Sequence, residues 1–138
     1  MTDLFALARS QSWSDRVAAA TQLTALVTPQ ARETLIALLD DPDIAVIEAA
    51  ATALLARGDV DPVLEAVWRS DDVGCSEALR TVFVQALTDG EPVQPVLAER
   101  AEAGATSAVR KGAREMLMAL DFIPREYIPD DDEEAAQP

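Results

Sequence analysis

The chain contains no histidine, one cysteine and one lysine among its 138 residues, and only 4% of its residues are aromatic. Without histidine, the most common general base, the usual catalytic triads and most transition-metal sites are excluded. A single cysteine cannot form an internal disulfide. No glycine-rich phosphate loop occurs either, because the five glycines are scattered singly. We therefore expect a non-enzymatic protein that holds no metal and no cofactor.

Long apolar runs are also missing. None approaches the roughly 20 residues that a membrane span requires, and the first residues, MTDLFALARSQSW, lack the basic region and cleavage site of a secretion signal. We expect a cytoplasmic protein that does not bind membranes. Although 49% of the residues are apolar, few are aromatic, so Ala, Leu and Val must fill the core. That composition favours helix packing over a core built from strands.

Positive charge is scarce, and the net charge of the chain is −14. Residues 1–120 carry ten basic and eighteen acidic side chains, a net charge of −8, whereas residues 121–138 carry one and seven, a net charge of −6. Nucleic-acid binding requires a basic stripe and is disfavoured. A protein partner of basic or neutral character is the simpler expectation.

Apolar residues recur with a period of 29 residues. Leu35, Leu38 and Leu39 would share one face of a first helix. The inner face of a second helix would consist of Val46, Ala49, Ala50, Ala53 and Leu54. The first face recurs at Leu64, Val67, Trp68, Val93, Val96 and Leu97, and the second at Cys75, Ala78, Leu79, Val82, Phe83, Val109, Gly112, Ala113, Met116 and Leu117. The last copy lies 34 residues on, which places a five-residue insertion in AEAGAT, residues 101–106. An earlier copy beginning at Val17 keeps the register loosely.

The breaks between helices repeat as well. Asp41-Pro42-Asp43 corresponds to Ser70-Asp71-Asp72 and to Ser12-Trp13-Ser14, and each offers a Ser or Asp as a helix cap. Pro42 is expected at a first helical position. Gly58, Gly90 and Gly104 are expected to end helices in the left-handed conformation.

These patterns predict an all-α fold, an α-solenoid of about four helical hairpins with an acidic disordered C-terminal tail. The expected hairpins pair 3–11 with 14–27, 30–40 with 42–57, 61–69 with 73–88, and 91–103 with 106–120. Stacked repeats bury a core that no single hairpin could bury. The expected buried residues are Leu35, Leu39, Ala50, Leu54, Val67, Leu79, Phe83 and Leu117. The expected division is a solenoid domain at 1–121, a docked capping segment at 122–129 and a disordered tail at 130–138.

The stretch LLDDPDIAVIEAAATALLARGD, Leu38 to Asp59, carries a family resemblance. An acidic turn followed by Val46, Ala50 and Leu54 at four-residue steps resembles a HEAT repeat of the short type found in phycobilisome-lyase-like proteins. The resemblance is good for residues 30–58, fair for 61–88 and 91–120, and weak for 3–27. It implies a scaffold or partner-binding surface and no catalytic residue.

Several residues admit a chemical interpretation beside a structural one. Cys75 could be a nucleophile but occupies the register of a buried packing residue. Asp40, Asp41 and Asp43 could bind a metal, but they lack the glycine and distal glutamate of a calcium loop, and helix capping explains them. Trp68 is expected in the core, whereas Trp13 either covers the first hairpin or stands partly exposed. The DDDEE run of the tail either keeps the protein dispersed or attracts a basic partner.

The outer side of the second helices is the expected partner surface. Ile44, Ala51 and Leu55 should point away from the first helices, with Ile47 between the two sides. The predicted partner-binding residues are Ile44, Ile47, Val73, Arg80, Arg110 and Arg114. The alternative is that Ile44 and Ile47 pack against adjacent repeats, and that Arg110, Lys111 and Arg114 pair with Glu115 or the tail. The expected function is a protein-protein interaction module, for example one that binds a basic toxin domain. The alternatives are an accessory or lyase-like protein acting on the bound cofactor of a larger enzyme, and a structural part of a larger complex.

Overall fold

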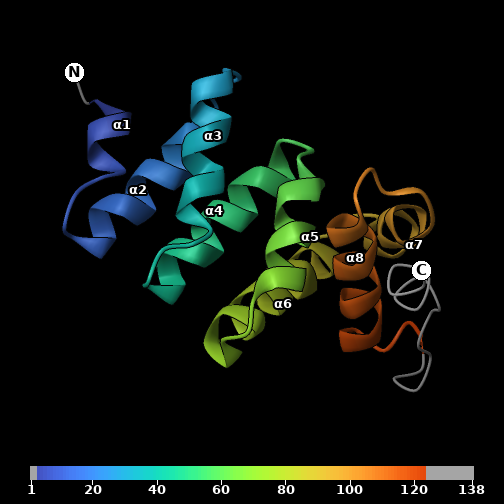
Figure 1. The fold of residues 1–138 in the computed structure, drawn as a ribbon. Coiled ribbons are helices and arrows are strands. Elements are labelled where there is room, and N and C mark those ends of the chain that lie inside the picture. The colour runs from blue at the N-terminus through green and yellow to red at the C-terminus, as the bar shows by residue number, and fades with distance from the viewer. Residues whose placement is uncertain (1–2, 124–138) are drawn as a thin grey trace, which may run out of the picture.

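The described part of the chain, residues 3–123 of a computed structural model, contains helices and no strands. The helices form successive hairpins whose members alternate between two layers, with α1, α3 and α5 in one and α2, α4 and α6 in the other (Figure 1). Their bounds are α1 Leu4–Leu7, α2 Trp13–Leu23, α3 Pro29–Leu38, α4 Ile44–Ala56, α5 Val60–Arg69, α6 Val73–Thr88, α7 Val93–Ala103 and α8 Ser107–Ala119. The predicted α-solenoid is confirmed.

Helix α4 lies at the centre of the first three hairpins. It packs against α2 and α6 on either side within its layer, and against α3 and α5 of the other layer. Ala51 is fully buried as a result. The expectation that Ala51 points outward is wrong, because α4 has a neighbour on both flanks.

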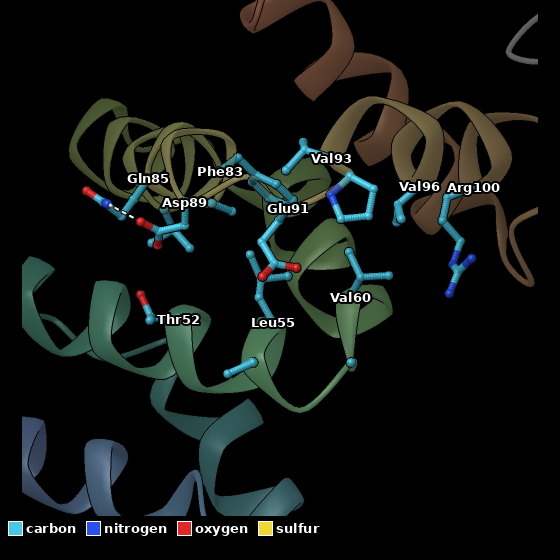
Figure 2. A pocket seen from close by; sticks show the side chains of 15 residues that line it. Thr52, Leu55, Val60, Phe83, Gln85, Asp89, Glu91, Val93, Val96 and Arg100 are labelled. Carbon is cyan, nitrogen blue, oxygen red and sulfur yellow. Dashed lines mark hydrogen bonds between the residues drawn. The ribbon is translucent and has the colours of Figure 1, made fainter.

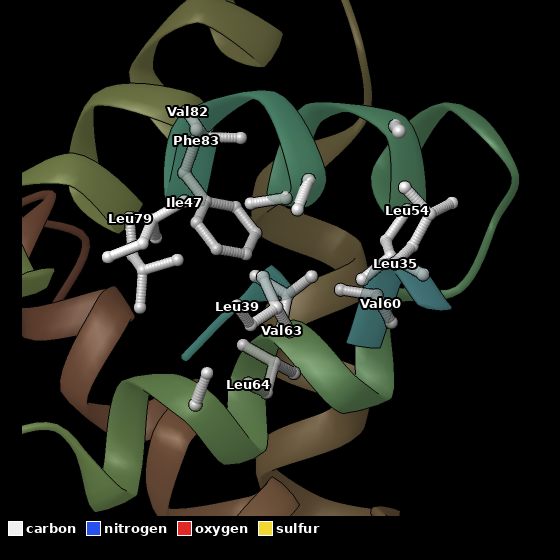
Figure 3. Packing of buried hydrophobic residues seen from close by; sticks show 14 of the residues in the cluster. Leu35, Leu39, Ile47, Leu54, Val60, Val63, Leu64, Leu79, Val82 and Phe83 are labelled. Atoms are coloured by element: carbon white, nitrogen blue, oxygen red, sulfur yellow. The ribbon is translucent and has the colours of Figure 1, made fainter. Parts of the chain in front are cut away.

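The core consists of small and aliphatic side chains with one large aromatic ring. Phe83 of α6 is 2% exposed, and its ring is directed toward Leu39 and Val63 (Figure 3). Of the eight residues predicted to be buried, all but Val67 are buried, and Val67 is half-buried against the same core. The 29-residue register therefore identified most of this core.

Polar side chains begin several helices as expected. Asp43 accepts a hydrogen bond from the Ala45 amide at 2.9 Å, and Asp72 accepts one from the Cys75 amide at 3.1 Å. Ser12 begins α2 without such a side-chain bond. Pro42 precedes the cap of α4 instead of occupying its first turn, because Asp43 takes the capping position.

Glycine ends two of the helices in the left-handed conformation. Gly58 has a φ of 82° and Gly90 a φ of 86°, as predicted. Gly104 has a φ of −57°, so the same expectation is wrong there. A Cβ at Gly104 would lie 2.6 Å from the Arg100 carbonyl oxygen, and this close approach explains the glycine.

The fourth hairpin departs from the regular stacking. Helix α8 packs mainly against α5 and α7, and it has no comparable packing against α6 (Figure 1). Gly112 allows this contact, because a Cβ there would lie 2.0 Å from the carbonyl oxygen of Leu64. Polar contacts join the same elements: Arg100 pairs with Asp61 at 2.7 Å, and the Thr106 hydroxyl donates to Glu65 at 3.2 Å.

The described chain ends beside α8. The Phe122 amide donates a hydrogen bond to the Leu117 carbonyl at 2.8 Å, and the Phe122 and Ile123 side chains are half-buried against the core. These two residues begin the predicted capping segment, 122–129, which stays a prediction. Residues 124–129 of that segment and the predicted tail at 130–138 lie outside the described residues.

Candidate partner-binding surface

Two adjoining hollows follow the turns that precede α4 and α6. One, of about 360 Å³, lies between α5, α6 and α8, and the other, of about 290 Å³, lies between the α3–α4 turn and the α5–α6 turn. They share Ser70, Asp71 and Asp72 of the α5–α6 turn, and the two adjoining hollows together are here named the turn groove. Helix α8 packs against α5 and has no comparable packing against α6, and this leaves the larger hollow, the wider part of the turn groove, open.

Three large apolar side chains of the turn groove are exposed. Ile44 is 43%, Trp68 40% and Val73 75% exposed. Ile44 lies over the start of α6, where a Cβ on Gly74 would come within 2.8 Å of its Cδ1 atom. Three apolar side chains along one groove can anchor a partner, because large desolvated residues dominate interface energetics.

Acidic side chains border the same groove. Asp40, Asp41, Asp71 and Asp72 line it, and Asp43 begins the helix at its edge. On the basic side, Arg69 pairs with Asp40 at 3.2 Å and Arg80 lines the wider end. The predominance of carboxylates near the turns gives the groove a local potential that favours positively charged groups.

Asp41 is held in place by an arginine of the first hairpin. Arg16 donates from Nε to Asp41 Oδ2 at 2.7 Å and from Nη2 to Asp41 Oδ1 at 3.1 Å, and its Nη1 donates to the Ser10 carbonyl at 2.8 Å. The hydrogen bonds to Asp41 raise the pKa of Arg16 above its ordinary value, so the guanidinium remains charged. The 29-residue register did not reveal this pair, because its two members stand at non-equivalent positions.

Trp68 stands at the surface with a cation beside it. The Lys111 ammonium of α8 lies 5.1 Å from the centre of the Trp68 ring, within the range of a cation–π contact. The expectation that Trp68 is buried in the core is wrong. Its register equivalents Leu39 and Leu97 are buried, but α5 has little packing against α6, so the corresponding face of α5 is left uncovered.

The turn groove contains four of the six predicted partner-binding residues. Ile44 and Val73 are exposed there, and Arg80 lines the wider end, where its Nε donates to the Ala119 carbonyl at 3.3 Å. Ile47 lines the floor but is only 4% exposed. Its predicted role as an exposed partner contact is wrong, because the packing of α6 against α4 covers it.

Arg110 and Arg114 lie elsewhere. Arg110 donates to the Gly104 carbonyl and Arg114 to the Ala101 carbonyl, each at 2.9 Å, so both point toward the C-terminal end of α7. They bind carbonyl oxygens that a helix end leaves without intrahelical partners. The expectation that they share one surface with Arg80 is wrong, because α8 turns this face toward α7.

The structure also places the remaining candidate residues. Cys75 is a half-buried free thiol at the edge of the turn groove, packed against the core. Within residues 3–123, no group of three or more Cys, Asp or Glu side chains could hold a metal ion. Trp13, for which two positions were open, is 53% exposed. Among the helices described, none is both long and apolar enough to cross a membrane.

Comparison with known proteins agrees with this architecture. No curated protein and no solved structure matches the chain. A family model for HEAT repeats matches residues 1–88, which extend from the N-terminus to the last residue of α6. The match does not distinguish the short phycobilisome-lyase-like type from other HEAT repeats. It covers more than half of the sequence, and the chain belongs to the HEAT repeat family.

Proposed function

We propose that the protein is a non-enzymatic interaction module that binds a basic protein partner in the turn groove. One observation carries the proposal: Ile44, Trp68 and Val73 are exposed in a depression bordered by aspartates. The apolar side chains would supply contact area, and the carboxylates would select a basic segment. HEAT repeats in general bind proteins, and this supports the proposal.

The test begins with the partner, obtained by cross-linking and mass spectrometry in the native host. Its affinity is then measured for Val73→Glu and for Val84→Glu, a matched control. Val84 is also exposed on α6, at 41%, but does not line the groove. We expect Val73→Glu to weaken binding about tenfold or more, as loss of an anchor does, and Val84→Glu to leave it unchanged. Equal affinities of the two variants would place the interface elsewhere.

The charge preference is tested separately. Asp71→Lys reverses one charge in the groove, and Glu102→Lys makes the same change at an exposed site of α7 outside it. We expect Asp71→Lys to slow association and Glu102→Lys to have a smaller effect, since charges near an interface mainly steer the encounter. If Asp71→Lys strengthens binding, the partner is acidic and the proposal is wrong.

The alternative, an accessory or lyase-like protein that handles a cofactor, has one observation in its favour. A pocket of about 410 Å³ lies between α4, α6 and α7. Asp89 and Glu91 line it, however, and they would repel the carboxylates or phosphates that many cofactors carry. Native mass spectrometry of the purified protein tests this alternative, which requires a retained anionic molecule.

A further inference from the structure

The pocket between α4, α6 and α7 lies at the opposite ends of the helices that border the turn groove. It is lined by the last turns of α4 and α6 and by the first turns of α7 (Figure 2). Because α4 has 13 residues, its two ends are about 20 Å apart. The pocket is therefore separate from the proposed partner site, and the inference drawn from it does not depend on that site.

The lining is mostly apolar. Val82, Phe83 and Ala86 contribute from α6, Leu55 from α4, and Val93 and Val96 from α7. A volume of about 410 Å³ falls within the range of small-molecule sites. The pocket can therefore take the hydrocarbon part of a small ligand.

Two acidic side chains make the electrostatic potential at one end of the pocket negative. Asp89 and Glu91 extend from the end of α6 and the turn after it, into the space that faces α4 (Figure 2). Arg100 lies at the other end of the pocket and is engaged by Asp61 at 2.7 Å and by Glu99. The two carboxylates therefore set the local potential at their end.

The backbone does not decide the sign of this potential. Helices α4 and α6 end at the pocket, whereas α5 and α7 begin there, so helix ends of both signs meet at it. Gly58 and Gly90, both with positive φ, turn the chain directly after α4 and α6. The two carboxylates at the end of α6 and in the turn after it therefore give this edge of the apolar pocket its negative charge.

We infer that this pocket binds a small organic monocation with an apolar body, such as an alkylammonium ion. The hydrocarbon body lies against Leu55, Ala86 and Val96, and the ammonium group lies between Asp89 and Glu91. A lysine side chain of a protein partner carries the same ammonium chemistry. The size of the pocket favours a free small molecule, and the experiment separates the two sources.

The test uses three six-carbon probes with different head groups: hexylammonium, 1-hexanol and hexanoate. Binding to the full chain is followed by nitrogen–proton correlation spectra. We expect saturable shifts at the amides of Leu55, Ala86 and Val96, with hexylammonium binding about three- to tenfold more tightly than 1-hexanol, since partly exposed ion pairs contribute modestly. Hexanoate should not saturate. Equal affinity of the three probes, or shifts confined to other residues, would overturn the inference.

Matched variants assign the preference to the carboxylates. Asp89→Asn with Glu91→Gln should bring hexylammonium and 1-hexanol to the same Kd, whereas Asp71→Asn with Glu102→Gln removes two charges outside the pocket and should keep the difference. If the first pair of changes leaves the difference intact, the assignment is wrong.

Blocking the pocket provides an independent check. Ala86→Phe, or Ala56→Leu should the first variant not fold, fills the lining and should abolish the binding of both neutral and cationic probes. Retained binding in a folded variant would contradict the location. Finally, N-acetyl-lysine methylamide is titrated under the same conditions. If it binds more tightly than hexylammonium, the pocket serves a partner's lysine and the assignment to a free molecule fails.

Discussion

Helices α1–α6 and the hairpin α7–α8 use the same apolar register in different ways. In the first three hairpins the second helices α2, α4 and α6 stack side by side, whereas α8 packs against α5 and α7 and leaves α6. The family match to HEAT repeats ends with α6, at the same point. The hairpin that breaks the regular stacking thus lies outside the part recognised as HEAT repeats.

Both candidate sites lie where the hairpin α7–α8 departs from the regular stacking. The wide part of the turn groove separates α6 from α8, and the apolar pocket separates α6 from α7. A regular fourth repeat would cover α6 with the next second helix. The departure of one hairpin therefore leaves two hollows at opposite ends of the same helix.

A substitution in the core of the regular half, helices α1–α6, should have the largest effect on stability. Ala50 is fully buried in α4, the helix with the most neighbouring helices in the described chain. We expect Ala50→Asp to lower the free energy of unfolding by about 3–5 kcal/mol, because it buries an unpaired charge. Urea unfolding followed by circular dichroism measures the change. Thr52→Asp, at an exposed position of the same helix, is the control, and equal stability of the two variants would refute the central position of α4.

The second prediction concerns the irregular half, the hairpin α7–α8. A Cβ at Gly112 would lie 2.0 Å from the oxygen and 2.7 Å from the carbon of the Leu64 carbonyl group, and backbone atoms cannot yield as a side chain can. We expect Gly112→Ala to cost about 1–3 kcal/mol, although alanine favours helix elsewhere. Gly112→Ser should cost more. Ala98→Ser at an exposed site of α7 should change stability by less than about 0.5 kcal/mol. A stabilised Gly112→Ala variant would show that α8 does not depend on this contact.

The sequence predicted the regular half better than the irregular one. Six of the seven buried residues that the register named correctly lie in the first three hairpins, where helix packing repeats with it. The register also assigned the inner face of α8, since Val109, Ala113 and Met116 are buried. It could not indicate that this face meets α5 as well as α7. A 29-residue period does not specify which neighbouring helices a given helix packs against.

Two features of the sequence nevertheless indicate the observed packing. Helix α4 carries apolar residues around nearly its whole circumference, and such a helix is typically buried on all sides; this predicts the burial of Ile47 and Ala51. Gly112 stands where the other second helices have Ala20, Ala49 and Ala78. A glycine among alanines at a packing position indicates a closer backbone approach. Together with the five-residue insertion, it marks the fourth hairpin as different.

A smaller effect is expected at the C-terminal end of the irregular half. Phe122 and Ile123 are half-buried against the core after the end of α8. A chain ending at Leu120 should be about 1–2 kcal/mol less stable than one ending at Pro129, because it loses this apolar contact. The chain ending at Pro129 should unfold like the full-length protein. Equal melting of all three would mean that residues 122–128 contribute nothing to the fold.

The smallest predicted effect distinguishes two roles of Thr106. Its hydroxyl accepts a hydrogen bond from the Val109 amide at 3.1 Å at the start of α8 and donates to Glu65 of α5 at 3.2 Å. We expect Thr106→Ala to cost about 1 kcal/mol, as the loss of a helix cap does, and Asp43→Ala at the start of α4 to cost a similar amount.

Two further variants separate the cap from the contact with α5. Thr106→Ser should recover most of the loss, because serine can make both bonds. Glu65→Ala should have little effect, since its hydrogen bond is exposed. The opposite result, in which Glu65→Ala destabilises as much as Thr106→Ala and Asp43→Ala remains mild, would show that the irregular hairpin is held by its side-chain contacts to α5. The regular half would then depend on caps and apolar packing, and the two halves would differ in the forces that hold them as well as in geometry.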